Sequence, residues 1–201
     1  MPNNSFVESY LRDVGSIVKT ISREDIKKVI LMLYDAWRED RQIFVAGNGG
    51  SASTASHFAS DLNKFTSVQG KRRFRAFALT DNMPLMTALV NDEGWENVYS
   101  WQLESFMRKG DVLVAISVHG GSGSDRAGPW SQNLLKAVKL VRQKEGRVVA
   151  IVGFDGGLLR KVSDSSIVVP IKSTPQVEGF HLVLTHLIVA RLRELLGESG
   201  K

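Results

Sequence analysis

The sequence contains no cysteine among its 201 residues. Disulfide bonds, thiolate zinc sites and cysteine nucleophiles are therefore excluded. The sequence also lacks an apolar run of the ~20 residues that a membrane-spanning helix needs. The first residues, MPNNSFVESYLRD, lack the basic segment and apolar core of a secretory signal. We therefore expect a cytoplasmic protein that does not interact with a membrane.

The chain also lacks internal repeats, low-complexity tracts and long linkers. Its length fits one domain over residues 1–201, with N-terminal helices up to residue 40 and an α/β core from residue 41. The net charge is +5, and the densest basic cluster is the short stretch KRRFR at 71–75. Such a short cluster is typical of a solvated loop, and no basic surface with interleaved aromatic residues is evident. Nucleic-acid binding is therefore not expected.

Helical periodicity alternates with short apolar runs along the chain. Apolar residues recur at helical spacing over 5–21, and Ser22 is a suitable N-cap for a second helix. Strands are predicted at 42–47, 75–80, 111–117, 147–154 and 165–171, with helices between them and a long closing helix at 176–197. Continuous apolar strands separated by helices predict a parallel sheet that helices cover on both faces. In this α/β architecture, ligands bind at the carboxyl ends of the strands.

Two glycine-rich loops follow predicted strands at that end of the sheet. The first is GNGGSAS at 47–53, and the second is SVHGGSGSDRAGPW at 117–130. Glycine lets backbone N–H groups approach a ligand closely, and a helix N-terminus attracts anions. Neither loop is a P-loop, and the first lacks the full dinucleotide fingerprint. One such loop alone can be a simple turn, but two together predict a polar ligand, such as a phosphate, held between them.

All four histidines lie in or beside these candidate elements. His57 and Asp61 are four residues apart and share a helix face. The second loop contains His119. The closing helix carries three candidates whose side chains can all lie along one broad face of the helix: Glu178, His181 and His186. Imidazole and carboxylate are the ligands of Zn²⁺ and also transfer protons near neutral pH. The alternative is structural: His57 and Asp61 form a surface pair, and the histidines of the closing helix pack at an interface between subunits. These residues alone do not decide between a functional site and this structural role.

Five stretches resemble the SIS (sugar isomerase) domain family, and specifically its phosphoheptose isomerases. In family order they are GNGGSASTASHFASDL, ALTDNMPLMTALVNDEGWENVY, GDVLVAISVHGGSG, VVAIVGFDGG and EGFHLVLTHLI, within residues 5–195. The resemblance implies a three-layer α/β sandwich with a five-stranded parallel sheet and an N-terminal helical extension. It implies a homotetramer with active sites at subunit interfaces. The implied reaction converts sedoheptulose 7-phosphate to a heptose 7-phosphate through an enediol, for synthesis of nucleotide-activated heptose.

The resemblance also implies roles for individual residues. Asp61 and His186 fall on the acid–base pair. The positions that hold a divalent metal, expected to be one Zn²⁺ per subunit, are His57, Asp61, Glu178 and His186. The implied substrate contacts are Asn48, Gly49, Gly50, Ser51, Asp92, Ser117, His119, Gly120, Ser122 and Glu178.

Several positions depart from the family pattern. Asp61 replaces a glutamate, Glu178 replaces a glutamine, and Phe65 and Pro175 replace an arginine and an aspartate. The phosphate loop, close to S-T-S-G-N-S in the family, reads SVHGGS here, where Arg126 or a protonated His119 could supply positive charge. We expect a metal-assisted isomerase of a sugar phosphate. Two alternatives remain: an isomerase of another phosphosugar, and a non-catalytic regulator that binds a sugar phosphate or a replication-initiator protein.

Overall fold

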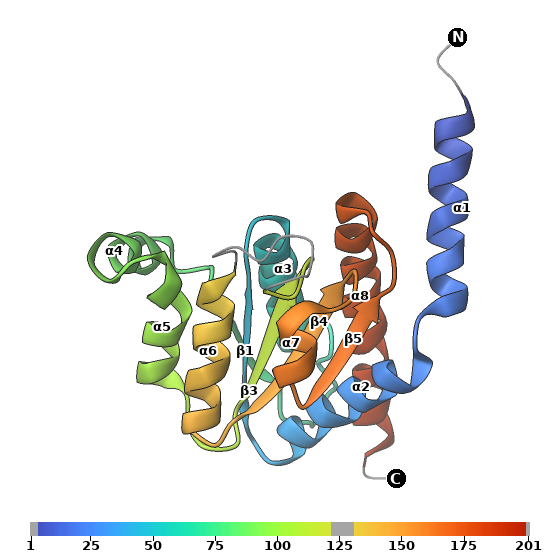
Figure 1. Cartoon of the computed structure of the whole chain (residues 1–201). Helices are drawn as coiled ribbons and strands as arrows, with labels where there is room; N and C mark the ends of the chain where they lie inside the picture. The colour runs from blue at the N-terminus through green and yellow to red at the C-terminus, as the bar shows by residue number, and fades with distance from the viewer. Residues whose placement is uncertain (1–3, 122–130, 200–201) are drawn as a thin grey trace.

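A computed structural model describes residues 4–121 and 131–199 (Figure 1). The strands in these ranges are β1 (Gln42–Gly47), β2 (Arg75–Ala78), β3 (Val112–Ser117), β4 (Arg147–Gly153) and β5 (Ser165–Val169). They form one parallel sheet in the order β2-β1-β3-β4-β5. Gly47 pairs with Ile116, so β1 and β3 end side by side and present their following loops together. The predicted five-stranded parallel sheet is confirmed.

Helices connect the strands and extend the chain at both ends. They are α1 (Asn4–Thr20), α2 (Arg23–Arg38), α3 (Gly50–Lys64), α4 (Met83–Glu93), α5 (Val98–Phe106), α6 (Gln132–Gln143), α7 (Gly157–Val162) and α8 (Thr174–Glu198), with a 3₁₀ turn η1 (Trp95–Asn97). Ser22 caps α2 as predicted, since its Oγ accepts a hydrogen bond from Asp25 N at 3.2 Å. None of these helices is both long and apolar enough to cross a membrane.

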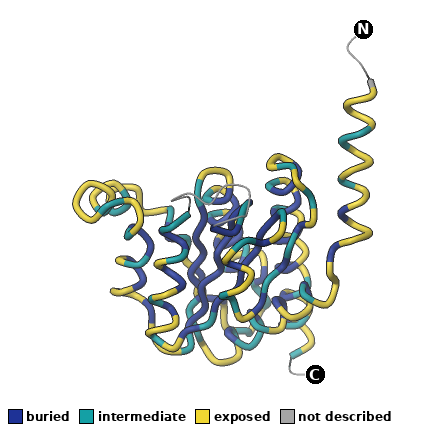
Figure 2. Tube along the Cα trace, in the orientation of Figure 1, coloured by how far each residue is buried: buried dark blue, intermediate teal, exposed yellow. Residues whose placement is uncertain are grey.

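The sheet lies between two helical layers, each enclosing its own apolar core. Ile43 and Val45 point into the core beneath α2, α3 and α8, whereas Phe44 and Ala46 point into the core beneath α5, α6 and α7. Successive strand residues face opposite sides, so a strand buried on both faces must be apolar throughout. Figure 2 shows these strands as the buried centre of the molecule. The predicted three-layer sandwich is confirmed.

Two helices expose apolar side chains. Helix α1 extends away from the sheet (Figure 1), and its Phe6 and Leu11 are 71% and 63% exposed. It contacts the body near its C-terminal end, where Ile17 is buried, and through a hydrogen bond of 3.2 Å from Gln176 Nε2 to Tyr10 O. Helix α4 has no buried residue. Both helices therefore offer apolar surface that the described part of this chain does not cover.

Candidate active site

Helices α3 and α8 run side by side in the same direction. At their N-terminal ends, the Glu178 carboxylate lies so close to Gly50 that a Cβ there would be 2.6 Å from Oε1. Further along both helices, His57 Nε2 lies 3.3 Å from His186 Nε2. The seam between α3 and α8 therefore aligns predicted site residues from two distant parts of the sequence.

Three predicted metal ligands meet in the middle of this seam. Asp61 Oδ2 lies 3.4 Å from His57 Nε2 and 3.6 Å from His186 Nε2. The three donor atoms lie within 4.8 Å of one another, and no other group of three or more His, Asp or Glu side chains this close was found among the described residues. We call His57, Asp61 and His186 the His–Asp–His group.

The spacing of this group fits a metal ion. Two ligand atoms ~2.0–2.1 Å from a tetrahedral Zn²⁺ are separated by about 3.3–3.4 Å. The observed distances of 3.3, 3.4 and 3.6 Å match that separation. Direct hydrogen bonds are usually ~2.7–3.2 Å long. Three protein ligands would leave a fourth position for water or substrate, as catalytic zinc sites do.

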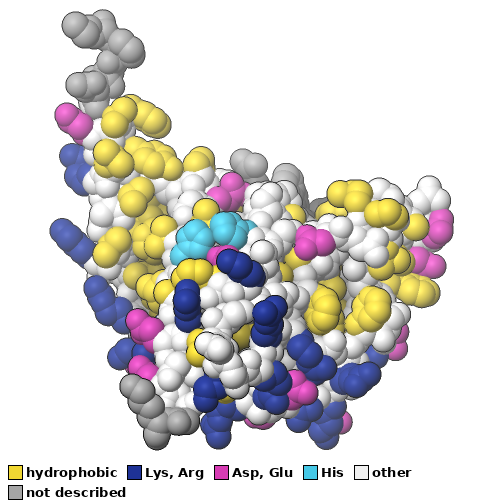
Figure 3. Space-filling view, turned by 180° about the vertical axis from the view of Figure 1, so that it is seen from behind, with side chains coloured by type: hydrophobic (Ala, Val, Ile, Leu, Met, Phe, Trp, Pro, Cys, Tyr) yellow, Lys and Arg dark blue, Asp and Glu magenta, His cyan; other side chains and the backbone are white. Residues whose placement is uncertain are grey.

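The His–Asp–His group lies on the open surface of the single chain. The side chains of His57 and His186 are 46% and 51% exposed, and that of Asp61 is 22% exposed. Histidine side chains gather on the rear face in Figure 3, with hydrophobic side chains beside them. On α8, Val183 and Leu187 are partly exposed near His186 in the sequence. The described part of this chain therefore encloses the His–Asp–His group only in part.

The other two candidates on α8 do not join this group. The Glu178 carboxylate lies against Gly50 at the start of α3, so Glu178 lies by the first glycine loop. His181 is fully buried, and neither ring nitrogen has a hydrogen-bond partner among the described residues. Burial lowers the pKa of His181 to about 4. The expectation that His181 and His186 edge one broad face was wrong, because α8 packs its His181 side into the core and leaves its His186 side exposed.

The first glycine loop exposes its backbone at the N-terminus of α3. Gly49 has a φ of 56°, which glycine adopts without strain, and it precedes the first turn of α3. Ser51 N donates to Asn48 O at 3.0 Å, which tightens the turn. Gly49 and Gly50 are exposed, whereas Ser51 is buried. The exposed backbone at this helix N-terminus can accept an anionic or oxygen-rich ligand.

The second loop is held by the loop after β4. Gly120 has a φ of 65°, and a Cβ there would lie 2.0 Å from Gly156 O. Leu159 N donates to Gly120 O at 2.8 Å, and Gly120 N donates to Ser117 Oγ at 3.1 Å. The Ser117 hydroxyl therefore shapes the loop and keeps its proton for another acceptor.

His119 does not extend freely from the second loop. Its ring packs against Phe154, with ring centroids 4.3 Å apart. The side chain is half-buried, and an aromatic neighbour restricts its orientation. Ser122 and Arg126, which were also predicted to contact or neutralise phosphate, lie outside the described residues.

Asp92 lies apart from these loops. It is exposed on α4, where Asn91 Nδ2 donates to Asp92 Oδ1 at 2.6 Å. Helix α4 lies at the opposite end of the molecule from α8 (Figure 1). The structure of the single chain therefore does not bring Asp92 to the His–Asp–His group.

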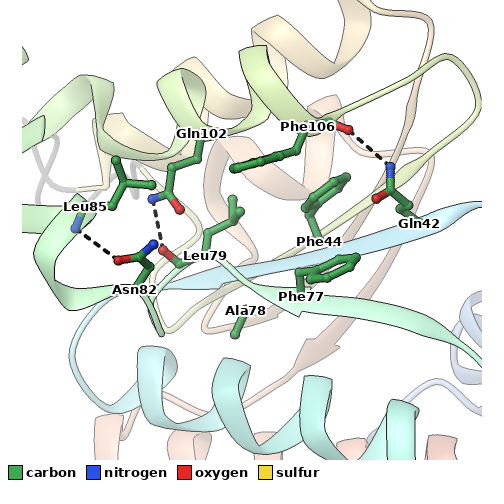
Figure 4. A pocket seen from close by; sticks show the side chains of 9 residues that line it. All are labelled: Gln42, Phe44, Phe77, Ala78, Leu79, Asn82, Leu85, Gln102 and Phe106. Carbon is green, nitrogen blue, oxygen red and sulfur yellow. Dashed lines mark hydrogen bonds between the residues drawn. The ribbon is translucent and has the colours of Figure 1, made fainter.

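A separate pocket of about 250 Å³ opens beside α4 and the edge strand β2. Figure 4 shows its lining residues: Gln42, Phe44, Phe77, Ala78, Leu79, Asn82, Leu85, Gln102 and Phe106. Its amides are already engaged, since Gln102 Nε2 donates to Leu79 O and Gln42 Nε2 donates to Phe106 O. This apolar pocket has no ionisable side chain in its lining, so it does not suit a sugar phosphate.

Two features near the site were missed in the sequence. Arg193 of α8 places its guanidinium 5.2 Å from the centre of the Phe65 ring. A cation therefore lies beside the position where the resemblance implies an arginine. Asn133 and Tyr99 contact Asn48 through hydrogen bonds. No short-range pattern marks these contacts, because each joins residues far apart in the chain.

Comparisons with known proteins agree with this fold. Residues 9–153 match the SIS domain family. A lincomycin biosynthesis protein of Streptomyces lincolnensis is 39% identical over 188 residues, covering 92% of this chain and 67% of that protein. A phosphoheptose isomerase of Geotalea daltonii is 32% identical over 196 residues, covering 96% and 97%. The solved phosphoheptose isomerase of Neisseria gonorrhoeae is 30% identical with a TM-score of 0.81, covering 94% of this chain and 95% of that one. The chain belongs to the SIS domain family, as an isomerase of the phosphoheptose isomerase type.

Proposed function

We propose that this enzyme converts sedoheptulose 7-phosphate to a heptose 7-phosphate, for synthesis of nucleotide-activated heptose. One observation carries the chemistry: the donor atoms of the His–Asp–His group are 3.3–3.6 Å apart on the α3–α8 seam. Relatives named phosphoheptose isomerase cover nearly the whole chain, which supports this substrate. We propose Zn²⁺ as the metal, because two imidazoles and a carboxylate suit it.

The reaction needs two proton transfers. A proton leaves C1 of the ketose to give the enediol, and C2 is then protonated to give the aldose. In the same process, a proton moves from the C1 hydroxyl to the C2 carbonyl oxygen. When bound, the metal would polarise the sugar oxygens and stabilise their negative charge.

We assign these transfers to Asp61 and His186. Asp61 Oδ2 faces both imidazoles, and its second oxygen can take the carbon-bound proton and return it to the adjacent carbon. His186 also has a second ring nitrogen, Nδ1, which can exchange the oxygen-bound proton. Each side chain therefore has one atom for the metal and one for proton transfer.

We propose that the two glycine loops hold the rest of the sugar phosphate. Gly49 and Gly50 would offer backbone N–H groups, and Ser51 would add a hydroxyl. Ser117, Gly120 and, outside the described residues, Ser122 would bind phosphate. The Glu178 carboxylate, which lies by Gly50, would accept hydrogen bonds from sugar hydroxyls. The metal contact expected for Glu178 and the substrate contact expected for Asp92 would each require movement or another subunit.

We further propose a cytoplasmic homo-oligomer, a tetramer, in which a neighbouring subunit covers the α3–α8 seam. Enediol chemistry requires exclusion of water, yet both imidazoles of the His–Asp–His group are about half exposed. Val183 and Leu187 are 52% and 43% exposed on the same helix. The exposed apolar residues of α1 and α4 offer further subunit contacts.

The direct test is to incubate the protein with sedoheptulose 7-phosphate in D₂O and follow the products by NMR. We expect aldose formation, with deuterium at C2 in those turnovers in which the proton held by Asp61 exchanges with solvent before it is returned. Asp61→Asn should lower turnover at least 100-fold, whereas Asp35→Asn on α2 serves as the matched surface control. Absence of turnover at high enzyme concentration would refute the proposal. Tight binding of the sugar phosphate without turnover would instead support the regulatory alternative.

An isomerase of a different phosphosugar is the second candidate. The relative that is 39% identical is named as a lincomycin biosynthesis protein, not as a phosphoheptose isomerase. The His119–Phe154 pair also gives the second loop an aromatic wall that can change sugar selection. Comparing kcat/KM for ketose phosphates of six, seven and eight carbons would decide: a preference of tenfold or more for another sugar would favour this candidate.

A further inference from the structure

Asn48, the first residue after β1, belongs to a compact hydrogen-bonded group. Its amide pairs reciprocally with that of Asn133 on α6: Asn48 Nδ2 donates to Asn133 Oδ1 at 3.0 Å, and Asn133 Nδ2 donates to Asn48 Oδ1 at 2.9 Å. Tyr99 OH, from α5, lies 3.2 Å from Asn48 Oδ1 and also donates to Gly47 O. Asn48 is thus held from two helices on the far side of the sheet from α3.

The partners of Asn48 are rigid. Tyr99 and Asn133 are both fully buried. Burial raises the pKa of Tyr99, so its hydroxyl keeps its proton and acts as a donor. Asn133 Oδ1 also accepts from Leu134 N at 2.9 Å, which fixes the orientation of the amide. Buried polar groups in such a network keep one geometry, because losing a partner leaves another group unsatisfied.

This network leaves one part of Asn48 available. Asn48 Oδ1 has two close partners, and one Nδ2 hydrogen is directed to Asn133. The other Nδ2 hydrogen has only Ser131 Oγ within reach among the described residues, at 3.4 Å. A substrate hydroxyl or phosphate oxygen could replace this long contact at little cost.

We propose that Tyr99 and Asn133 are positioning residues, which hold Asn48 so that its remaining N–H points at the bound sugar phosphate. The network also connects the loop after β1 to α6, the helix that follows the second glycine loop. In this proposal, neither Tyr99 nor Asn133 touches the substrate. This inference rests on the proposed sugar-phosphate site.

A double-mutant cycle tests the role in activity. Tyr99→Phe keeps the ring but removes the hydroxyl, and we expect kcat/KM to fall about tenfold, the effect of one neutral hydrogen bond. In an Asn48→Ala background, Tyr99→Phe should change kcat/KM less than twofold, whereas its effect on Tm should persist. Tyr34→Phe on α2 removes a distant hydroxyl that contacts Ser199 and should leave kcat/KM unchanged. Equal losses in both backgrounds would overturn the proposal.

Amide hydrogen exchange gives a readout that needs no turnover. Tyr99→Phe and Asn133→Ala should each speed exchange at residues 47–50 at least fivefold, and Tyr34→Phe should not. Unchanged exchange in both variants would overturn the positioning role even if the enzyme is active. If the wild-type protein fails to isomerise the sugar phosphate but the exchange result holds, the proposed substrate is wrong and the network stands.

Discussion

Gly120→Ala is predicted to separate the second glycine loop from the loop after β4, which contacts it. Gly120 has a φ of 65°, and its missing Cβ would lie 2.0 Å from Gly156 O. Both loops meet through backbone atoms. A Cβ added to Gly157 would likewise lie 2.3 Å from His119 O. Rotating a side chain cannot relieve this contact, so the loops themselves must move.

The expected loss of stability follows from two contributions. An alanine in the left-handed region costs about 1–2 kcal/mol. Separating the loops also weakens the bonds from Leu159 N to Gly120 O and from Gly153 N to Val118 O, each worth about 1 kcal/mol. The total is about 3 kcal/mol, which corresponds to a fall in Tm of about 6–12 °C for a chain of this length.

Thermal and urea unfolding of the variant and a matched control would measure this loss. Gly197→Ala makes the same chemical change in α8, where no described atom outside the local helix backbone lies within 4 Å of the ideal Cβ. That control should raise stability by about 0.5–1 kcal/mol, because alanine favours a helix over glycine. A Tm for Gly120→Ala within 2 °C of wild type would refute the backbone contact. The variant should also bind inorganic phosphate more weakly, as calorimetry would show.

Three further outcomes are expected. His57→Ala should reduce the zinc content of purified protein from about one per chain to below 0.2 by mass spectrometry, because it removes one of three donors; unchanged content would contradict the site. Stability should fall as the pH drops from 6.5 towards 4, by up to about 3 kcal/mol, since unfolding lets His181, with a folded pKa of about 4, take up a proton. His181→Phe should remove this pH dependence of stability, as urea titrations at pH 5 and 7.5 would show. The same pH dependence in the variant and the wild type would contradict the assignment to His181. Leu187→Glu should dissociate the oligomer in light scattering, whereas Leu31→Glu on α2, also exposed, should not; unchanged mass would place the interface elsewhere.

The fold was predictable because its signals are local. The three central strands, β1, β3 and β4, are nearly continuous apolar runs, and the capping contact of Ser22 spans only three residues. The ends of the two edge strands were the least accurate strand boundaries, since β2 stops at Ala78 rather than at residue 80 and β5 stops at Val169 rather than at residue 171. An edge strand pairs on one side only, so its ends depend on a single neighbour.

The site was predictable only in part. The spacing of His57 and Asp61 placed both side chains on one face of α3, and the family resemblance pointed to His186. Spacing alone did not separate His181 from His186, because the choice depends on which face of α8 packs against the sheet. The structure buries His181 and exposes His186.

The sequence by itself determined the parallel three-layer architecture, the two glycine loops and the family, because periodicity, turn residues and motif order are properties of neighbouring residues. Only the tertiary structure decided that α3 and α8 run parallel, which brings the three donors to metal-binding distances. It also decided that Glu178 lies at Gly50 and that Tyr99 and Asn133 hold Asn48. These contacts join residues 51 or more positions apart, and packing of the helices on the sheet sets them.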